Sequence, residues 1–243
     1  TPVVRLNQGG ILVVGDTGTG VGDDGVTTFG RLGNDALMNL NAARFNFVGQ
    51  NGAATAETMG VLSLDNGRSL IAVTSGSGGT ATLTVATLFR NPETRALGIV
   101  TSDNYSLGSS SFLKLADGGA TLTHLGGTDS RGTDKAIAVG LTSGTTATRS
   151  GNWGNTFVRY DAAAGFVPLD PAADYVNATA MAFPAVNPDG NDNVRLPWTA
   201  VHPTNAASSV TLGGDTTVNS LVFFNDNASY DDKMFTLDGA AGT

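Results

Sequence analysis

The amino-acid sequence predicts an all-β protein, and within that class it favours a right-handed parallel β-helix (β-solenoid) over a β-sandwich. Short runs of alternating apolar and small polar residues recur roughly every ten residues, with turn-forming clusters between them. Aromatic residues make up only 7% of the chain, and Gly reaches 33 residues. Stacked turns of a solenoid favour such small and β-branched side chains, because equivalent inward positions pile into columns. The β-sandwich stays open as the alternative.

The expected strands follow from these runs. Alternation predicts strands at residues 37–40, 44–48, 61–64, 70–73, 81–85, 112–115, 121–125 and 136–141. The segment "GGILVV" at 9–14, with its apolar run at 11–14, is interpreted as a further strand. Clusters such as "DNG" at 65–67, "SGSGG" at 75–79 and "ADGG" at 116–119 predict the turns between them. Asn219, in "TVNSL", is expected to join a column of asparagines whose amides bond between successive turns.

We expect residues 1–243 to form one solenoid module cut from a longer or processed chain. Residues 1–150 are predicted to be stacked turns, residues 151–200 a section rich in loops, aromatic residues and proline, and residues 201–243 a β-strand repeat. No capping segment is evident at either end, so open terminal strands that pair with a neighbouring copy are expected.

The segment "VTLGGDTTVNSLVFFNDNASYDDKMFTLDG" (210–239) resembles the autotransporter-associated β-strand repeat of large exported bacterial surface proteins. Segments 31–49, 57–91, 157–178 and 192–196 are similar to sequences found between such repeats, in the same order. The resemblance implies a passenger-like parallel β-helix at the cell surface or beyond it, with a structural or adhesive role and no catalytic residues to transfer. Self-association into a filament, neighbouring surface proteins and glycans are the partners that we expect.

Composition excludes several classes. The net charge of −8 disfavours binding to a nucleic-acid backbone. The absence of cysteine excludes disulfides and thiolate metal sites. No apolar run approaches the roughly 20 residues of a membrane-spanning helix, so we expect no membrane insertion of this segment.

Glycines at the start of the chain contain a literal G-x-G-x-x-G match, Gly20 to Gly25. A dinucleotide site needs a helix after these glycines. Here Asp23 and Asp24 lie inside the loop, and glycines and β-branched residues follow it. We therefore interpret the segment as a turn between strands and expect no nucleotide or other organic cofactor.

Calcium is the one metal that the sequence suggests. The segment "NPDGNDN" supplies Asp189, Asn191 and Asn193 as candidate oxygen ligands, with a weaker cluster of Asp16, Asp23 and Asp24 near the start. Both segments also have the composition of ordinary turns, in which Asp and Asn side chains bond their own backbone. The two interpretations stay open at this point.

No catalytic residues are predicted, because the two histidines, His124 and His202, stand in no metal or triad spacing. A β-helix polysaccharide lyase or glycoside hydrolase is the enzymatic alternative, and its first candidates are Asp161, Asp170 and Asp174 with Arg159. Aromatic residues gather in one region, where they either stack on sugar rings or plug the end of a core. This group comprises Trp153, Phe157, Tyr160, Phe166, Tyr175, Phe183 and Trp198.

Overall fold

The computed structural model describes residues 2–15, 32–102, 106–127, 132–144, 156–179, 183–197, 209–212, 216–224 and 236–239. Within them the fold is all-β, and the one helical element is the short 3-10 turn η1 (Gly132–Asp134). No helix in this described part has the length and apolar character to cross a lipid bilayer.

The chain divides into two compact units. Residues 1–123, 138–147 and 151–168 form the N-terminal unit, and the remaining residues form the C-terminal unit. The prediction of one module over residues 1–243 stays a prediction.

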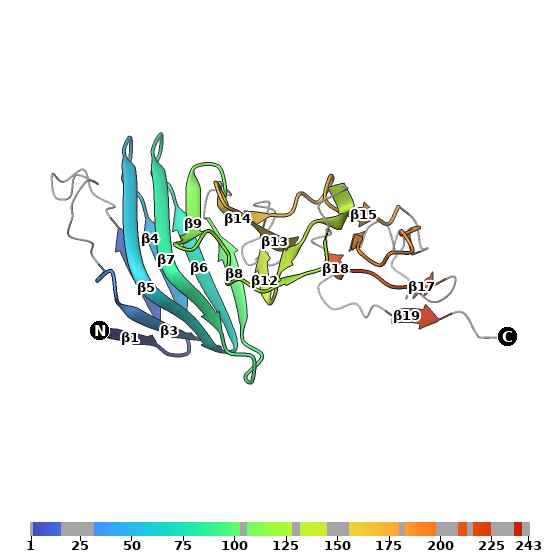
Figure 1. The fold of residues 1–243 in the computed structure, drawn as a ribbon, viewed down its shortest axis with the longest axis horizontal. Coiled ribbons are helices and arrows are strands. Elements are labelled where there is room, and N and C mark those ends of the chain that lie inside the picture. The colour runs from blue at the N-terminus through green and yellow to red at the C-terminus, as the bar shows by residue number, and fades with distance from the viewer. Residues whose placement is uncertain are drawn as a thin grey trace. The chain divides into compact units, whose positions relative to one another are not determined.

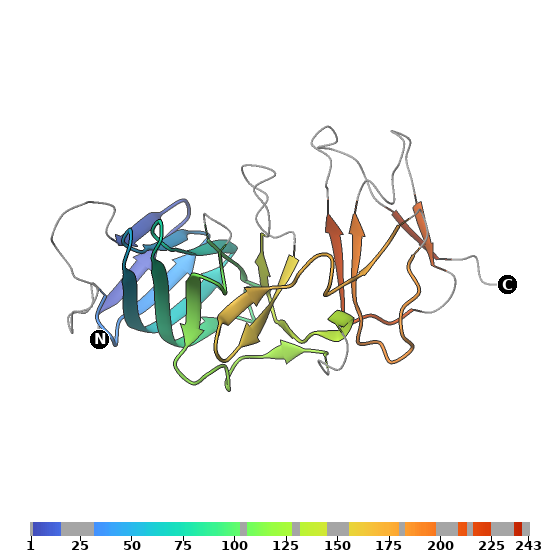
Figure 2. The same cartoon turned by 90° about the horizontal axis from the view of Figure 1, so that it is seen from above.

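The N-terminal unit is a parallel β-solenoid of about five turns, as predicted, in which each turn contributes one strand to each of two sheets (Figures 1 and 2). The strands of sheet A are, in spatial order, β1 (Val3–Leu6), β3 (Leu37–Asn41), β5 (Ala54–Asn66), β7 (Thr80–Arg90) and β9 (Ser111–Leu115). Those of sheet B are β2 (Ile11–Gly15), β4 (Arg44–Val48), β6 (Arg68–Thr74), β8 (Leu97–Thr101) and β12 (Leu141–Ser143). All of these pairings are parallel, which decides between the solenoid and the β-sandwich.

The core lies between the two sheets and is built from columns of inward side chains, as the composition predicted. One column of sheet B runs from Leu12 through Phe45 and Ile71 to Val100, each opposite its neighbour in the register. Phe45, Ile71 and Val100 are fully buried, each with 0% of its surface exposed. Burying side chains of this size stabilises the fold by about 1.5–3 kcal/mol each. The columns therefore hold successive turns together in addition to the backbone ladders.

The corner between the two strands of each turn uses left-handed backbone. Gly9, Ala42 and Gly67 have φ angles of 78°, 49° and 62°. They lie in consecutive turns, since Gly9 N–H donates to Ala42 O at 3.1 Å, and Ala42 N–H donates to the carbonyl before Gly67 at 2.9 Å. Only glycine adopts such angles without steric cost, so the "GG" and "NG" pairs of the sequence mark this corner.

An antiparallel hairpin covers the C-terminal end of this solenoid. β13 (Thr156–Asp161) pairs with β12 and with β14 (Gly165–Pro168), antiparallel in both cases. The hairpin also reaches sheet A, because the Tyr160 hydroxyl accepts a 2.8 Å hydrogen bond from the backbone N–H of Leu115 in β9. The hairpin therefore bridges the last strands of both sheets of this unit. The expectation of open strands at the two ends of the chain stays a prediction, because this hairpin lies inside the chain.

The C-terminal unit contains shorter parallel pairings. β15 (Val176–Asn177), β16 (Asn193–Pro197) and β18 (Ser220–Phe224) form one sheet, and β17 (Ser209–Leu212) pairs with β19 (Thr236–Gly239). The Nδ2 of Asn219 donates to the Oδ1 of Asn193 at 2.8 Å, and the Nδ2 of Asn193 donates to the carbonyl of Lys135 at 2.9 Å. The predicted amide bond between turns is thus confirmed for Asn219.

Two strand predictions were wrong in extent. Of residues 121–125 only β10 (His124–Leu125) is a strand, and of residues 136–141 only β11 (Ile137–Ala138) and the start of β12 are. The Asp117 carboxylate accepts hydrogen bonds from the N–H groups of Gly119 and Thr121, both at 2.9 Å, and so holds this stretch in a turn. Alternation of apolar residues does not reveal such a side-chain cap.

Candidate functional site

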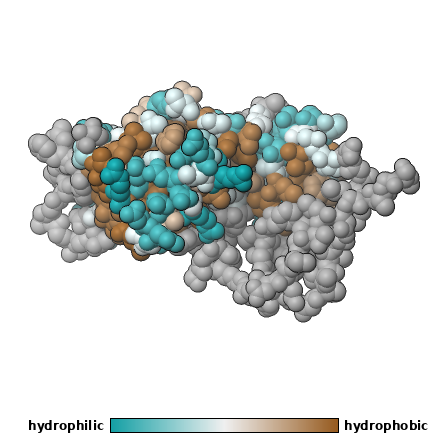
Figure 3. Space-filling view, turned by 90° about the horizontal axis from the view of Figure 1, so that it is seen from below, coloured by the Kyte–Doolittle hydropathy of each residue, from teal (hydrophilic) through white to brown (hydrophobic). Residues whose placement is uncertain are grey.

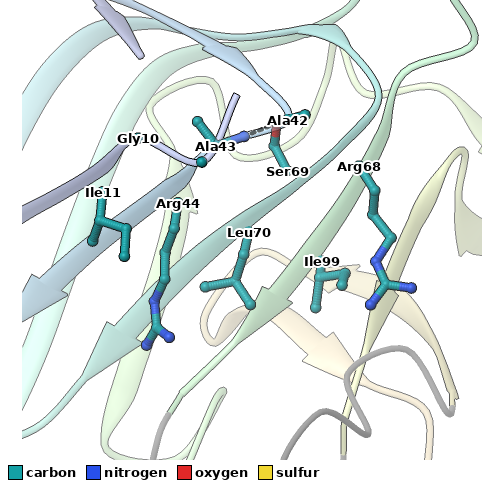
Figure 4. A pocket seen from close by; sticks show the side chains of 10 residues that line it. Gly10, Ile11, Ala42, Ala43, Arg44, Arg68, Ser69, Leu70 and Ile99 are labelled. Carbon is teal, nitrogen blue, oxygen red and sulfur yellow. Dashed lines mark hydrogen bonds between the residues drawn. The ribbon is translucent and has the colours of Figure 1, made fainter. Parts of the chain in front are cut away.

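A pocket of about 400 Å³ lies on the outer face of sheet B, at the corner of the first turns of the solenoid (Figure 4). We call it the outer-face pocket. Its lining residues are Gly9, Gly10, Ile11, Ala42, Ala43, Arg44, Arg68, Ser69, Leu70 and Ile99. The volume lies within the roughly 300–1,000 Å³ of small-molecule sites.

Strand register brings the apolar part of the outer-face pocket together. Ile11 lies opposite Arg44, Arg44 opposite Leu70, and Leu70 opposite Ile99, on four neighbouring strands. Leu70 and Ile99 alternate with inward residues, so they form a small apolar cluster with Ala72 on the outside of the sheet. Their exposed fractions are only 5% and 2%, whereas Ile11 is 65% exposed. The pocket therefore has a buried aliphatic floor and an exposed aliphatic edge.

Two arginines supply the charge. Arg44 and Arg68 come from β4 and β6, and Figure 4 shows their side chains extending to the same side with Leu70 and Ile99 between them. The Nε–H of Arg44 donates to the Oδ1 of Asn46 at 2.6 Å, which orients its guanidinium. The two arginine side chains thus lie on either side of the aliphatic floor of the pocket.

The corner backbone is largely occupied by its own hydrogen bonds. Gly10 N–H donates to Asn7 O at 2.7 Å, and Arg44 N–H donates to Gly10 O at 2.9 Å. The Ala43 N–H donates to the buried Ser69 hydroxyl at 3.3 Å. The small side chains of this corner leave the space that becomes the pocket, whereas its main chain is committed to stacking the turns.

The predicted calcium ligands lie in and after the turn before β16. Asp189 is exposed and accepts the N–H of Asn191 at 3.1 Å, as in an ordinary Asx-turn. Asn193 is 0% exposed, and its Oδ1 accepts bonds from Asn219 and from the hydroxyl of Ser220 at 2.6 Å. The amide oxygen of Asn193 is thus committed to the stack. The calcium site stays a prediction.

A neighbouring carboxylate in the same turn is buried. Asp192 is 0% exposed, and its Oδ2 accepts the N–H of Asn187 at 2.7 Å. Its Oδ1 accepts the hydroxyl of Thr133 at 2.8 Å. In the described part of the chain no three His, Cys, Asp or Glu side chains are grouped closely enough to hold a metal ion. The candidate ligands Asp16, Asp23 and Asp24 and the Gly20 to Gly25 motif lie outside the described residues.

The candidate acids of the enzymatic alternative stabilise turns. Asp161 accepts the N–H groups of Ala163 and Ala164 in the β13–β14 turn, both at 2.9 Å, and lies 3.5 Å from Arg159. The backbone hydrogen bond from Ala164, then that from Ala163, holds the pKa of Asp161 below its usual value. Such a carboxylate stays ionised and is a poor general acid.

Asp170 and Asp174 form a similar local turn. The Oδ2 of Asp174 accepts the N–H of Asp170 at 2.8 Å, and the Oδ1 of Asp170 accepts the N–H of Ala172 at 2.8 Å. His124 is exposed in β10, and His202 lies outside the described residues. Each described carboxylate of the enzymatic alternative therefore has a conformational role in its own turn.

The aromatic residues behave as a plug in the described part of the chain. Phe166 is 0% exposed and meets the Tyr160 ring edge to face, with ring centroids 5.0 Å apart. Tyr175, in the C-terminal unit, is 3% exposed, and Phe183 packs against the small core there. Trp153 and Trp198 lie outside the described residues. Phe166 and Tyr175 are accordingly too buried to stack on a sugar.

Sequence reasoning missed two buried polar groups in the N-terminal unit. Glu57 is 4% exposed and accepts the N–H of Leu32 at 3.2 Å, in an inward column with Leu83. Glu57 lies two residues before Met59 in the same strand, so the alternation of the strand could have placed both side chains on the inward face. A chain of hydroxyls, in which Ser111 bonds Ser106 at 2.7 Å and accepts the Ser75 N–H at 2.9 Å, had no such signal.

No match was found to a known protein family, to a curated protein or to a solved structure. What can be stated of this chain from its geometry is therefore its fold, a parallel β-solenoid with a capping hairpin and an arginine-lined pocket.

Proposed function

We propose that this chain is a non-enzymatic structural or adhesive module of an exported bacterial surface protein. The observation that carries the proposal is the stacked architecture itself. Backbone ladders run through about five turns of two parallel sheets, and columns such as Phe45 over Ile71 fill the space between them. A stack of this kind is quasi-one-dimensional and extends by adding turns, which suits a spacer or a display surface.

The resemblance of residues 210–239 to the autotransporter-associated repeat supports the same proposal. Within that segment β17 pairs with β19 in parallel, and β18 pairs with β16. The Ser220 hydroxyl and the Asn193 amide, 27 positions apart, bond across one turn. A repeat whose strands pair in parallel at a turn's length is what a passenger-like β-helix requires.

A structural role also fits the described carboxylates better than the enzymatic alternative does. A retaining or inverting glycosidase needs one carboxyl group whose pKa is raised so that it can donate a proton. The pKa of Asp161 is shifted the opposite way, and Asp170 accepts a backbone N–H of its own turn. The enzyme and glycan-binding functions are therefore the second and third candidates.

Self-association is the partner interaction that the proposal includes. β1 and β2 each pair on one side only among the described strands, and Val3, Ile11 and Val13 are 47%, 65% and 52% exposed. Figure 3 shows apolar residues bordering a hydrophilic patch on the face that it presents. Edge strands with exposed apolar side chains favour pairing with a second chain.

Cell fractionation tests the proposed location and role. Antibodies raised against the 243-residue chain are expected to label intact cells of the source bacterium. The purified chain is expected to resist protease cleavage within the strands of its two parallel sheets. Detection only in the cytoplasm would overturn the proposal. Release of new reducing ends from a panel of acidic and neutral polysaccharides would favour the enzyme instead, and hits on a glycan array would favour the glycan-binding module.

A matched pair of variants tests the role of the capping hairpin in association. Gly165 has φ +74°, and a Cβ there would lie 2.1 Å from the carbonyl oxygen of Leu113, so Gly165→Ala should displace the hairpin from β9. Gly118→Ala carries the same kind of backbone strain, at φ +66°, with nothing within 4 Å of its Cβ. Sedimentation velocity over a range of concentrations should show more association for Gly165→Ala than for Gly118→Ala. Equal behaviour would remove the cap from the account of association.

A further inference from the structure

We propose that Asn66 and Gly67 form a site of self-catalysed deamidation, at which the main-chain nitrogen of Gly67 displaces ammonia from the side-chain amide of Asn66. This chemistry stands apart from the structural role proposed above. It rests on a contrast between the two Asn–Gly pairs of the chain, Asn51–Gly52 and Asn66–Gly67. All four residues are exposed, yet the next turn of the solenoid holds the reacting groups of only the first pair.

At Asn66 the two reacting groups already face each other. The Gly67 N–H donates to the Oδ1 of Asn66 at 2.8 Å. Because a carbonyl bond is about 1.2 Å long, the Cγ of Asn66 lies within about 4 Å of the Gly67 nitrogen. Gly67 has no Cβ to shield this nitrogen, and among the described residues no carbonyl of a neighbouring turn accepts its N–H. A rotation within the Asn66 side chain therefore brings nitrogen and carbon into position for attack.

Asn51 and Gly52 have the same residue types and a similar backbone, but the next turn holds both. The φ angle of Gly52 is 70°, and that of Gly67 is 62°. The Gly52 N–H donates to the carbonyl of Ser77 at 2.9 Å, and the Oδ1 of Asn51 accepts the Ser77 N–H at 2.8 Å. Both bonds must open before the Gly52 nitrogen can attack, so the stacked turn protects this pair.

The reaction at Asn66 needs water as its one co-reactant. The Gly67 N–H gives its proton to water, its nitrogen bonds to the Cγ of Asn66, and the Cγ–Nδ2 bond breaks as Nδ2 takes up a proton and leaves as ammonia. The resulting five-membered imide divides the hydrolysis into two steps. One water molecule then adds to either carbonyl carbon of the imide and breaks the bond from that carbon to the Gly67 nitrogen. Addition at Cγ gives aspartate, and addition at the main-chain carbonyl gives isoaspartate.

The product would change the corner between β5 and β6. The main-chain carbonyl of Asn66 accepts the Ala42 N–H, and that of Gly67 accepts the Leu97 N–H, both at 2.9 Å. Isoaspartate adds one carbon to the main chain at this corner and converts the Asn66 carbonyl into a free carboxylate. Both products add one negative charge. Deamidation is therefore expected to weaken the hydrogen bonds that join this corner to the turns before and after it.

Peptide mapping by mass spectrometry tests the proposal on the full 243-residue chain, incubated in neutral buffer. We expect Asn66 to deamidate faster than Asn51 by about tenfold or more, because hydrogen bonds must first open at Asn51. In concentrated urea the stacked turns are lost, so the two pairs should react at similar rates. Three results would each overturn the proposal: no product at Asn66, equal rates in the folded chain, or the same difference in urea.

Asn66→Gln and Asn51→Gln form a matched pair of variants. Glutamine keeps a neutral amide, but its longer side chain would have to close a six-membered ring, which forms far more slowly. Ion-exchange chromatography resolves chains that have gained a negative charge. The first acidic species to form should be absent in Asn66→Gln and unchanged in Asn51→Gln, and in the wild type it should show faster hydrogen exchange at the Ala42 and Leu97 amides. An acidic species that persists in Asn66→Gln, or that is lost in Asn51→Gln, would contradict the assignment.

Discussion

The capping hairpin provides the most informative single substitution, Tyr160→Phe. The Tyr160 hydroxyl accepts the Leu115 N–H at 2.8 Å, and its own O–H points to the Leu115 carbonyl at 3.4 Å. Leu115 is only 5% exposed, so removing the hydroxyl leaves a nearly buried N–H without that acceptor. The phenyl ring retains its edge-to-face contact with Phe166. The expected loss in the free energy of unfolding is therefore that of one hydrogen bond, about 1–2 kcal/mol.

The same substitution has a pH signature. Burial is the main cause that raises the pKa of Tyr160 above its ordinary value of 10.0. A raised folded-state pKa means that the contribution of this tyrosine is fully present below the unfolded pKa and is lost as the pH rises through the folded pKa. Tyr160→Phe should therefore unfold at lower urea at neutral pH, yet lose less stability than the wild type above about pH 10.

Urea unfolding followed by near-ultraviolet circular dichroism measures both effects, and hydrogen exchange at the Leu115 amide localises the first. A loss of about 1–2 kcal/mol corresponds to a melting temperature lower by about 3–6 °C in a unit of this size. A Tyr160→Phe variant that unfolds within about 0.3 kcal/mol of the wild type, with an unchanged exchange rate at the Leu115 amide, would contradict this role of the hydroxyl.

Four other substitutions test the corner, the amide ladder and the hairpin turn. Gly67→Ala should lower the free energy of unfolding more than Gly9→Ala does, because both glycines have positive φ but only a Cβ at position 67 would meet another atom, the Cβ of Ala42 at 3.0 Å. We expect a loss of about 1–2 kcal/mol for Gly9→Ala in thermal unfolding, and equal losses for the two variants would contradict the steric reasoning. Asn193→Ala should lower unfolding stability by about 2–3 kcal/mol in urea, since it breaks a buried amide network; a change below about 0.5 kcal/mol would refute that role. The pKa of Asp161 is lowered from its ordinary value of 3.8, so its contribution to stability is present above that value and is lost as the pH falls through the folded-state pKa. Asp161→Asn should therefore make the free energy of unfolding, measured between neutral and acidic pH, fall less steeply on acidification, and an unchanged pH dependence would contradict this role.

Much of the fold could be predicted from local pattern. The strands around residues 37–40 and 44–48 were confirmed with nearly correct bounds, because apolar alternation there is interrupted only by the "NAA" corner. The length of a turn could not be predicted, since it varies along the stack. Ala43 and Ser69 bond across 26 positions, whereas Ser75 and Ser111 bond across 36. Insertions at corners leave the ladders intact and erase a fixed period from the sequence.

The outer-face pocket was beyond prediction for a related reason. Arg44 and Leu70 meet only because β4 and β6 stack with a specific register, and a shift of β6 by one residue would turn Leu70 to the core face. A single sequence shows that Arg44 alternates with Phe45, but not which residue lies beside it in the next turn. The aromatic plug was easier, because Tyr160 and Phe166 lie in one hairpin and their pairing is local in sequence.

The capping hairpin also limits how copies of the N-terminal unit can associate by strand addition. Sheet B ends in antiparallel strands, and the edge of β9 in sheet A is covered by Tyr160 and by the close approach of Gly165 to Leu113. Addition of a parallel strand at this end would first require the hairpin to leave. Among the described strands, β1 and β2 are then the edges of this unit that can accept a partner. An interface that uses the same edge of each copy is closed by a two-fold axis and stops at two chains, whereas a filament needs two different edges. Strand addition through this unit alone therefore favours a pair of chains over the filament that the repeat pattern suggested.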